Sequence, residues 1–316
     1  GPGRSLHGPR AALLEAREVP LGGVRAMNVL RVLPSKDVPT IGAWCFLDRF
    51  GPAEVRMRVE PHPHIGLQTV TWPLVGEIRH RDTIDSDVVL RRGQLNLMTA
   101  GNGIAHSEYS VGEEAGPLDA LQLWVVLPDG AATGTPGFEQ HLSLPGLVLR
   151  AESGSDAEVT VVMGSYAGVS SPATAHTPIV GAEIRVAPGT TVALPFDPAW
   201  EHGLLLVTGD ARVSGAELAE TALDVDDVLF LGDSRASVTV TSEGGALLFL
   251  LGGEPFEQDL VMWWNFAARS HEEIAQARED WEAGSDRFGH VVGHGDERIP
   301  APPIPPVRLM PRRRRI

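Results

Sequence analysis

Two short clusters of histidine and carboxylate residues are the part of this sequence best suited to chemistry. His62 and His64 stand at positions i and i+2, each preceded by a proline, and His106 and Glu108 repeat that spacing further along. Side chains at i and i+2 point to the same face of an extended strand, and the prolines disfavour a helix. On facing strands the two pairs would bring three nitrogens and one oxygen together. That donor set suits a divalent first-row metal, including non-haem iron.

The spacing by itself is a weak signal. The chain has 11 histidines among 316 residues, and chance at that frequency yields about 0.4 His-x-His pairs. Unrelated surface histidines are therefore the alternative interpretation. The glycines between the two pairs favour a site, because Gly76, Gly93, Gly101 and Gly103 stand where a small barrel needs tight turns and close backbone approach.

The elements that must position these residues are short β-strands. Runs of β-favouring residues alternate with glycine and proline, of which the chain has 35 and 25. Examples of such runs are 67–75, 94–98, 118–127, 204–208 and 246–251. Many short strands with turn signals close together are typical of a β-sandwich or barrel. Because the runs occur in both halves, the sequence predicts an all-β fold of two domains in tandem.

The end of the chain has a different pattern. Ser270 followed by Glu273 forms a capping box, which predicts a helix that runs to about Trp281. Five prolines within residues 299–307 predict an extended segment of polyproline type. The run Arg312–Arg315 is expected to be a solvated tail, with contact to an acidic partner as the alternative.

Composition excludes several classes of protein. The net charge of −15 argues against binding to nucleic-acid backbones. The single cysteine, Cys45, excludes an intramolecular disulfide framework and a multi-cysteine zinc site, and we expect it to be a buried apolar residue. No apolar run reaches the roughly 18–20 residues of a bilayer span, and no secretory signal is visible. We therefore expect a cytoplasmic protein with no direct nucleic-acid partner and no membrane contact.

The motifs around the two clusters follow a characteristic order. First come His62-Pro-His-x-Gly66, Thr69-Val-Thr71, Gly76-Glu77, His80-Arg-Asp82, Gly93 and Met98-Thr-Ala-Gly-Asn-Gly-Ile-Ala-His106-Ser-Glu108. Later come Leu121-Gln-Leu-Trp-Val-Val-Leu127, Gly252-Gly-Glu-Pro255, Trp263-Trp-Asn-Phe266 and Arg269-Ser-His-Glu-Glu-Ile274. This order resembles the pirin family of bicupins over most of the chain, and the N-terminal motif is the more specific part.

The resemblance implies two tandem antiparallel cupin barrels of the jelly-roll type. It makes His62, His64, His106 and Glu108 the ligands of one divalent metal per chain, most commonly Fe(2+). The expected domains are an N-terminal metal-binding cupin over 1–140, a metal-free cupin over 141–256, and a C-terminal helix with an extended tail over 257–316 that packs on the barrels.

The expectation of a metal-free second barrel comes from an internal comparison. When Gly76 is aligned with Gly209, Pro195 and Asp197 stand at the positions of the first histidine pair. The segment 232–238 has no counterpart of the second pair, and His202 stands alone.

Strand alternation extends the expectations to neighbouring residues. If the first histidine pair faces the barrel interior, Gln68, Val70 and Trp72 should face it too. Gln68, which stands where many cupins place a glutamate ligand, is then either a hydrogen-bonding partner at the metal or a polar residue at the barrel mouth. We expect Val70 and Trp72 to be core residues. His80 is interpreted as a buried histidine with a satisfied hydrogen bond, with a pocket-lining role as the alternative.

Three functions from different classes fit these features. Resemblance to bacterial pirins implies a dioxygenase that uses dioxygen to cleave a flavonol such as quercetin, with Glu108 as a metal ligand and as the base for a substrate hydroxyl. Pirins also bind transcription factors and metabolic enzymes, so a non-enzymatic, iron- and redox-responsive regulatory protein is the alternative. The third is a cupin with a structural metal, although a site without cysteine ligands is unlike closed zinc sites. The enzyme is the reading that we favour.

Overall fold

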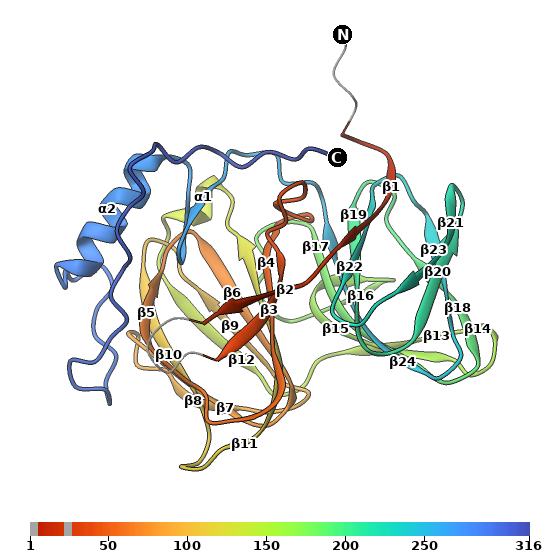
Figure 1. Ribbon diagram of the computed structural model, residues 1–316, viewed down its shortest axis with the longest axis horizontal. Coiled ribbons are helices and arrows are strands. Elements are labelled where there is room, and N and C mark those ends of the chain that lie inside the picture. Colours follow the sequence, from red (N-terminus) through yellow and green to blue (C-terminus); the bar gives the residue numbers. More distant parts are fainter. Residues whose placement is uncertain (1–5, 22–26) are drawn as a thin grey trace, which may run out of the picture.

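The computed structural model describes residues 6–21 and 27–316 and shows two β-barrels side by side (Figure 1). The strands of the first barrel are β2 (Arg17–Pro20), β3 (Asn28–Leu33), β4 (Trp44–Val55), β5 (Arg58–His64), β6 (Leu67–Val75), β7 (Ile78–Asp82), β8 (Asp87–Leu90), β9 (Leu95–Thr99), β10 (Ile104–Ser110), β11 (Gly116–Val126) and β12 (Gly137–His141). They form a sheet in the order β12-β9-β6-β11-β4-β3-β2 and a second sheet in the order β5-β10-β7-β8. The short helix α1 (Asp129–Ala132) precedes β12.

The second barrel also consists of two antiparallel sheets. Its strands are β13 (Gly146–Leu149), β14 (Ala151–Ser153), β15 (Ala157–Tyr166), β16 (Val169–Ser170), β17 (Ile179–Val186), β18 (Thr190–Pro195), β19 (Glu201–Gly209), β20 (Ala211–Gly215), β21 (Leu218–Leu223), β22 (Val228–Gly232), β23 (Ser237–Ser242) and β24 (Ala246–Gly253). One sheet has the order β22-β19-β24-β17-β15-β13 with β16 beside β15, and the other has the order β14-β18-β23-β20-β21. The predicted all-β fold with two tandem barrels is confirmed.

The first strand of the chain belongs to the sheet of the second barrel. β1 (Pro9–Leu14) is antiparallel to β22, with Ala12 opposite Phe230 and Leu14 opposite Val228. These residues fall within the segment 1–140 that the sequence assigns to the N-terminal domain. The division of the chain into domains stays a prediction, and β1 pairs with the barrel opposite to the one that the division assigns it to.

A shared hydrophobic core joins the two barrels. It combines buried side chains such as Trp44 and Trp72 of the first barrel with Met163 and Phe249 of the second. The indole nitrogen of Trp44 donates a hydrogen bond of 2.9 Å to the carbonyl of Val180. Burial of large aromatic side chains is the main driving force for such contact. The two barrels therefore share one hydrophobic core.

The C-terminal region packs on the outer face of the first barrel. The hairpin β25 (Val261–Trp263) and β26 (Phe266–Ala268) leads into helix α2 (His271–Glu282). The hydroxyl of Ser270 accepts a hydrogen bond from the backbone nitrogen of Glu273, as the capping box predicts. The buried face of α2, including Ile274 and Trp281, belongs to one hydrophobic cluster with Ile65 and Ala105 of the first barrel. No helix among residues 6–21 and 27–316 is long and apolar enough to cross a membrane.

The arginine-rich tail is held against the protein at Arg314, which the prediction of a solvated tail missed, whereas Arg312, Arg313 and Arg315 are exposed as expected. Figure 1 shows the last segment running from α2 across the first barrel toward the second. Arg314 donates to Glu201 on β19 at 2.8 Å and to the carbonyl of Thr40 at 2.7 Å. The Glu201 side chain is 1% exposed. A buried carboxylate needs a cation to offset its lost hydration, and the tail supplies it.

Candidate metal centre

Two neighbouring strands bring the predicted histidines together. His62 and His64 lie on β5, and His106 lies opposite His62 on the antiparallel strand β10. β5 is the edge strand of its sheet, where proline is tolerated because one side of the backbone needs no donor. Pro61 and Pro63 can therefore alternate with the histidines without breaking the pairing with β10.

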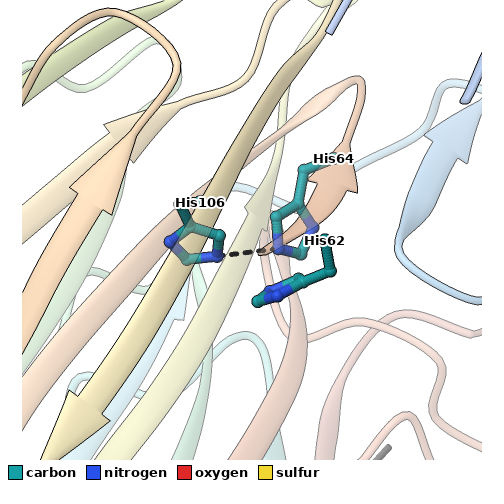
Figure 2. Close-up of side chains that lie close together, drawn as sticks. All are labelled: His62, His64 and His106. Atoms are coloured by element: carbon teal, nitrogen blue, oxygen red, sulfur yellow. Dashed lines mark hydrogen bonds between the residues drawn. The ribbon is translucent and has the colours of Figure 1, made fainter. Parts of the chain in front are cut away.

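The three imidazoles converge on one point inside the first barrel. Figure 2 shows them pointing toward one another, and one nitrogen of each lies within 4.8 Å of the others. The Nε2 atoms of His64 and His106 are 3.2 Å apart. All three rings are buried, with His62 the most exposed at 7%. The expectation that both positions of the His-x-His pair face the barrel interior is confirmed.

Hydrogen bonds on the outer side of two rings fix which nitrogen carries the proton. The Nδ1 atom of His62 donates to the carbonyl of Glu60 at 2.8 Å, and that of His64 donates to the carbonyl of Asn265 at 3.0 Å. A carbonyl can only accept, so each Nδ1 is protonated and each Nε2 presents a lone pair. Asn265 belongs to the turn of the β25–β26 hairpin, so the C-terminal region orients a histidine of the first barrel.

A chain of two side chains performs the same task for His106. Its Nδ1 atom lies 3.4 Å from Nδ1 of His80, and Nε2 of His80 lies 2.6 Å from the carboxylate of Asp82. Asp82 accepts two more hydrogen bonds of 3.0 Å from the backbone nitrogens of Ile84 and Ser86. With Nε2 of His80 donating to Asp82, Nδ1 of His80 can accept from Nδ1 of His106, which leaves Nε2 of His106 unprotonated. The prediction that His80 is a buried, hydrogen-bonded histidine is confirmed.

This donor set fits a metal cation. Three unprotonated Nε2 atoms face one point, and two of them are only 3.2 Å apart, a contact between lone pairs that a cation between them would make favourable. Burial lowers the pKa of His62 to about 4. Burial and the neighbouring histidines lower the pKa values of His64 and His106 well below the ordinary value. The rings are thus neutral at physiological pH, which is the form that binds metals.

Glu108 lies beside the three histidines but outside their tight group. One carboxylate oxygen, Oε1, is 3.9 Å from Nε2 of His106. The other, Oε2, accepts a hydrogen bond of 3.3 Å from the hydroxyl of Thr71. Burial raises the pKa of Glu108 to about 7, against the opposing effect of the Thr71 hydrogen bond. The structure therefore places a carboxyl that can exchange a proton near neutral pH next to the imidazoles.

The site opens into a cavity of about 390 Å³ with aromatic walls. Phe46 and Trp124 stack at 3.8 Å on one side, and Trp263 and Trp264 line the cavity from the β25–β26 hairpin. Trp264 has a φ of 52°, a left-handed conformation that is unusual for a bulky residue and costs roughly 1–3 kcal/mol. Such strain is characteristic of functional sites, and here it places an indole at the cavity.

The expectation that Gln68, Val70 and Trp72 face the barrel interior together with His62 and His64 is wrong. β5 ends at His64, and β6 begins at Leu67 in the other sheet, after a turn at Gly66 with φ of 72°. The alternation therefore restarts. Thr71 faces the site, whereas Gln68 is buried between the barrels, where its amide donates to Thr99 and to the carbonyl of Thr174, both at 3.0 Å. Neither predicted role of Gln68 holds.

The remaining predictions concern residues away from the site. Val70 and Trp72 are core residues as expected, although they belong to the core shared by both barrels. Cys45 is buried, and burial raises the pKa of its thiol to about 12. His202 is buried in the second barrel, stacked at 4.0 Å on Phe196. The metal-free state of that barrel stays a prediction.

Sequence and structure comparisons place the chain among known proteins. The family "Pirin" matches residues 24–125, and the "Pirin C-terminal cupin domain" matches residues 181–289. A Pseudomonas aeruginosa protein named "Putative quercetin 2,3-dioxygenase" is 42% identical over 294 residues, which cover 92% of this chain and 89% of that protein. A "Pirin-like protein" of Caulobacter vibrioides is 34% identical over 302 residues, which cover 92% and 98%.

The same relationship holds in three dimensions. The crystal structure of a quercetin 2,3-dioxygenase from Acinetobacter baumannii matches with a TM-score of 0.85 and 36% identity, over 95% of this chain and 97% of that one. The two barrels are thus cupin domains. Together with the family matches to both barrels, this similarity shows that the chain belongs to the pirin family of bicupins.

Proposed function

We propose that this protein is an iron-dependent dioxygenase that cleaves flavonols of the quercetin type with dioxygen. The observation that carries the proposal is the group of three buried, neutral imidazoles beside an aromatic-walled cavity. Relatives named as quercetin 2,3-dioxygenases, at 42% and 36% identity, support the reaction and the substrate class. A cytoplasmic location belongs to the same proposal, since a lone cysteine is compatible with a reducing compartment.

His62, His64 and His106 would hold one Fe(2+) through their Nε2 atoms, and Glu108 would supply the fourth ligand through Oε1, the oxygen that Thr71 leaves free. The bound iron would supply Lewis-acid and redox chemistry. The outer hydrogen bonds from Glu60, Asn265 and the His80–Asp82 pair hold the rings in orientation, so little ordering is needed when the metal binds.

The cavity walls position a flat substrate. Phe46 and Trp124 stack nearly parallel, at an interplanar angle of 11°, and planar aromatic ligands pack well against such faces. Trp263 and Trp264 cover another side of the cavity and help to exclude water. A flavonol ring system held there would have its hydroxyl and ketone oxygens within reach of the imidazole group, which supplies the orientation that a reaction with a second substrate needs.

Glu108 is the proposed base. A flavonol must lose a hydroxyl proton before it is readily oxidised, and a general base is most effective when its pKa is close to the working pH. Burial raises the pKa of Glu108 to about 7, and a metal at the imidazoles would lower it again by its positive charge. Oε2 is held by Thr71, so Oε1 would receive the proton, once it has moved off the metal.

The test is an aerobic turnover assay on iron-loaded protein with a panel of flavonols. We expect flavonol absorbance to fall together with uptake of dioxygen in equal amounts. The matched control is the His62→Ala/His106→Ala variant treated with iron in the same way, which should show neither change. Iron-loaded wild-type protein that leaves every flavonol intact would contradict the proposed reaction.

A further inference from the structure

A second cavity, lined by positive charges, adjoins the metal cavity. Its volume is about 760 Å³, and segments from both ends of the chain line it. We call this cavity the basic groove. Its cationic lining residues are Arg17, Arg31, Lys36, Arg312, Arg313 and Arg315. No carboxylate belongs to its described lining. In a protein with a net charge of −15, a cavity of this composition is unlike the rest of the molecule.

Most of the charge in the basic groove is not neutralised by the protein. Arg31 forms a bidentate ion pair with Asp48 at 2.8 and 2.9 Å, and Arg313 contacts the exposed Asp259 at 3.2 Å. The other four cations, in the part of the chain that the structure describes, have no carboxylate oxygen within 4.0 Å. Burial and the adjacent Arg31 charge lower the pKa of Arg17, and the Asp48 charge opposes them.

The tail arginines are held in place by backbone contacts. The backbone nitrogen of Arg312 donates to the carbonyl of Leu260 at 2.8 Å, and that of Arg315 donates to the carbonyl of Asp37 at 2.9 Å. Between them, Arg314 is anchored to Glu201. The tail backbone is therefore fixed beside the cavity, so an anion has to order only the exposed arginine side chains when it binds.

The basic groove and the metal cavity are adjacent. Arg31, Pro34 and Arg312 line both of them. A ligand with its aromatic part beside the imidazoles would reach the basic groove with a substituent that passes Arg31 and Arg312. A cleft lined by charges of one sign concentrates its field on an entering ion, and guanidinium groups match the oxygens of carboxylate, sulfate or phosphate groups in pairs.

We propose that the basic groove binds an anionic substituent (carboxylate, sulfate or phosphate ester) carried by the aromatic substrate of the metal site. The aromatic half of this inference rests on the proposed function, whereas the anionic half rests on the charges and the shape of the groove. A small ligand is favoured over an acidic protein because the cations line a cavity beside the metal cavity and not a convex surface.

The experiment compares two matched probes on metal-loaded protein without dioxygen. One is 6-hydroxynaphthalene-2-sulfonate and the other is 2-naphthol, which has the same ring and hydroxyl but no charged group. By titration calorimetry we expect the sulfonate to bind about threefold to tenfold more tightly at low salt, the range for a few partly exposed charge pairs. High salt should remove this preference.

Two variants separate the groove from the net charge of the protein. Lys36→Ala/Arg315→Ala should abolish the preference for the sulfonate and leave the affinity for 2-naphthol unchanged. Arg150→Ala/Arg212→Ala removes the same charge from exposed positions on the second barrel that line neither cavity, and it should keep the preference. Equal binding of both probes by the wild-type protein, or equal losses in both variants, would overturn the proposal.

Further arms distinguish the remaining outcomes. Inorganic sulfate that binds as tightly as the sulfonate probe would show a site for free anions and overturn the role of a substituent. A poly-glutamate peptide that binds the groove, with no preference between the naphthols, would show a protein-binding surface instead. Absence of flavonol turnover with the sulfonate preference intact would reject the proposed oxidation and leave the anion site standing.

Discussion

His80 and Asp82 contact each other directly behind the metal centre, with Nε2 of the imidazole 2.6 Å from a carboxylate oxygen. Both residues lie on β7 and are almost fully buried. Because Nδ1 of His80 in turn contacts His106, the carboxylate determines which nitrogen of His106 is free. Asp82, which touches none of the three histidines of the group, should thus influence how tightly the candidate site binds a metal.

Asp82→Asn should weaken metal binding without removing any proposed ligand. An asparagine amide in place of Oδ2 would donate to Nε2 of His80 and reverse its tautomer, which would direct the proton of His106 toward the metal. Changes of this kind typically cost about 10–100-fold in metal affinity, to be measured by anaerobic Fe(2+) competition with a chelator. Asp87→Asn, which breaks the exposed pair of Asp87 with Arg79, is the control and should bind normally.

Replacement of two proposed ligands should abolish metal binding. In His62→Ala/His106→Ala, two of the three converging nitrogens are lost, and we expect elemental analysis to find close to no metal after iron loading. His202→Ala removes a buried histidine from the second barrel and should retain one metal per chain. Wild-type metal content in the double variant would show that the ligands lie elsewhere, and a lower content in His202→Ala would contradict a metal-free second barrel.

Glu108→Gln distinguishes a ligand from a base. The amide can still offer a carbonyl oxygen to the metal, but it cannot accept a substrate proton. We expect a lower metal affinity and, per bound iron, a flavonol turnover reduced by about 10²–10⁴-fold. Turnover must be normalised to the iron measured in the same sample. If turnover per iron stays within about tenfold of wild type, Glu108 is a ligand and not the base.

The second barrel should lose stability in acid through His202. An unfolded histidine titrates near pH 6.5, and burial lowers the pKa of His202 to about 4 in the folded protein. Between these values only the unfolded chain takes up the proton, so the free energy of unfolding falls as pH drops from 6.5 toward 4. Above pH 6.5 this residue has no such effect.

The matched variant for this effect is His202→Phe, which keeps a ring against Phe196 and cannot titrate. From pH 7 to pH 4.5, the wild-type protein should lose about 2 kcal/mol more than the variant in denaturant unfolding. His176→Phe, at an exposed position, should behave like the wild type. Parallel losses in wild type and His202→Phe would refute the assignment.

The grouping of the three histidines was predictable from sequence because its geometry is local. Alternation along an extended strand puts His62 and His64 on one face, and the same rule applies to His106 and Glu108. The rule failed at Gln68 because it does not reveal where one strand ends. Gly66 makes the turn, and a side chain there would meet the carbonyl oxygen of Ala267 at 1.9 Å, a contact with a residue about two hundred positions away.

The features that the sequence did not reveal depend on contacts between distant segments. Asn265 orients His64 through its backbone carbonyl, which leaves no trace in residue type. A run of arginines predicts solvent exposure, whereas Arg314 contacts the buried Glu201, which lies more than a hundred residues earlier. The pattern of charges along the chain does not show which opposite charge a side chain contacts in the folded protein.

The two prolines of β5 have a consequence for the behaviour of the protein at high concentration. The carbonyl of Pro61 accepts a hydrogen bond from Ile299 on the outer edge of β5, and in an extended strand the nitrogen and carbonyl of one residue point to the same side. The nitrogens of Pro61 and Pro63 therefore face outward, where a strand from another molecule would require donors. Open sheet edges promote aggregation because another strand can pair with them. The two prolines of β5 should therefore hinder the pairing of this edge with a strand of another molecule.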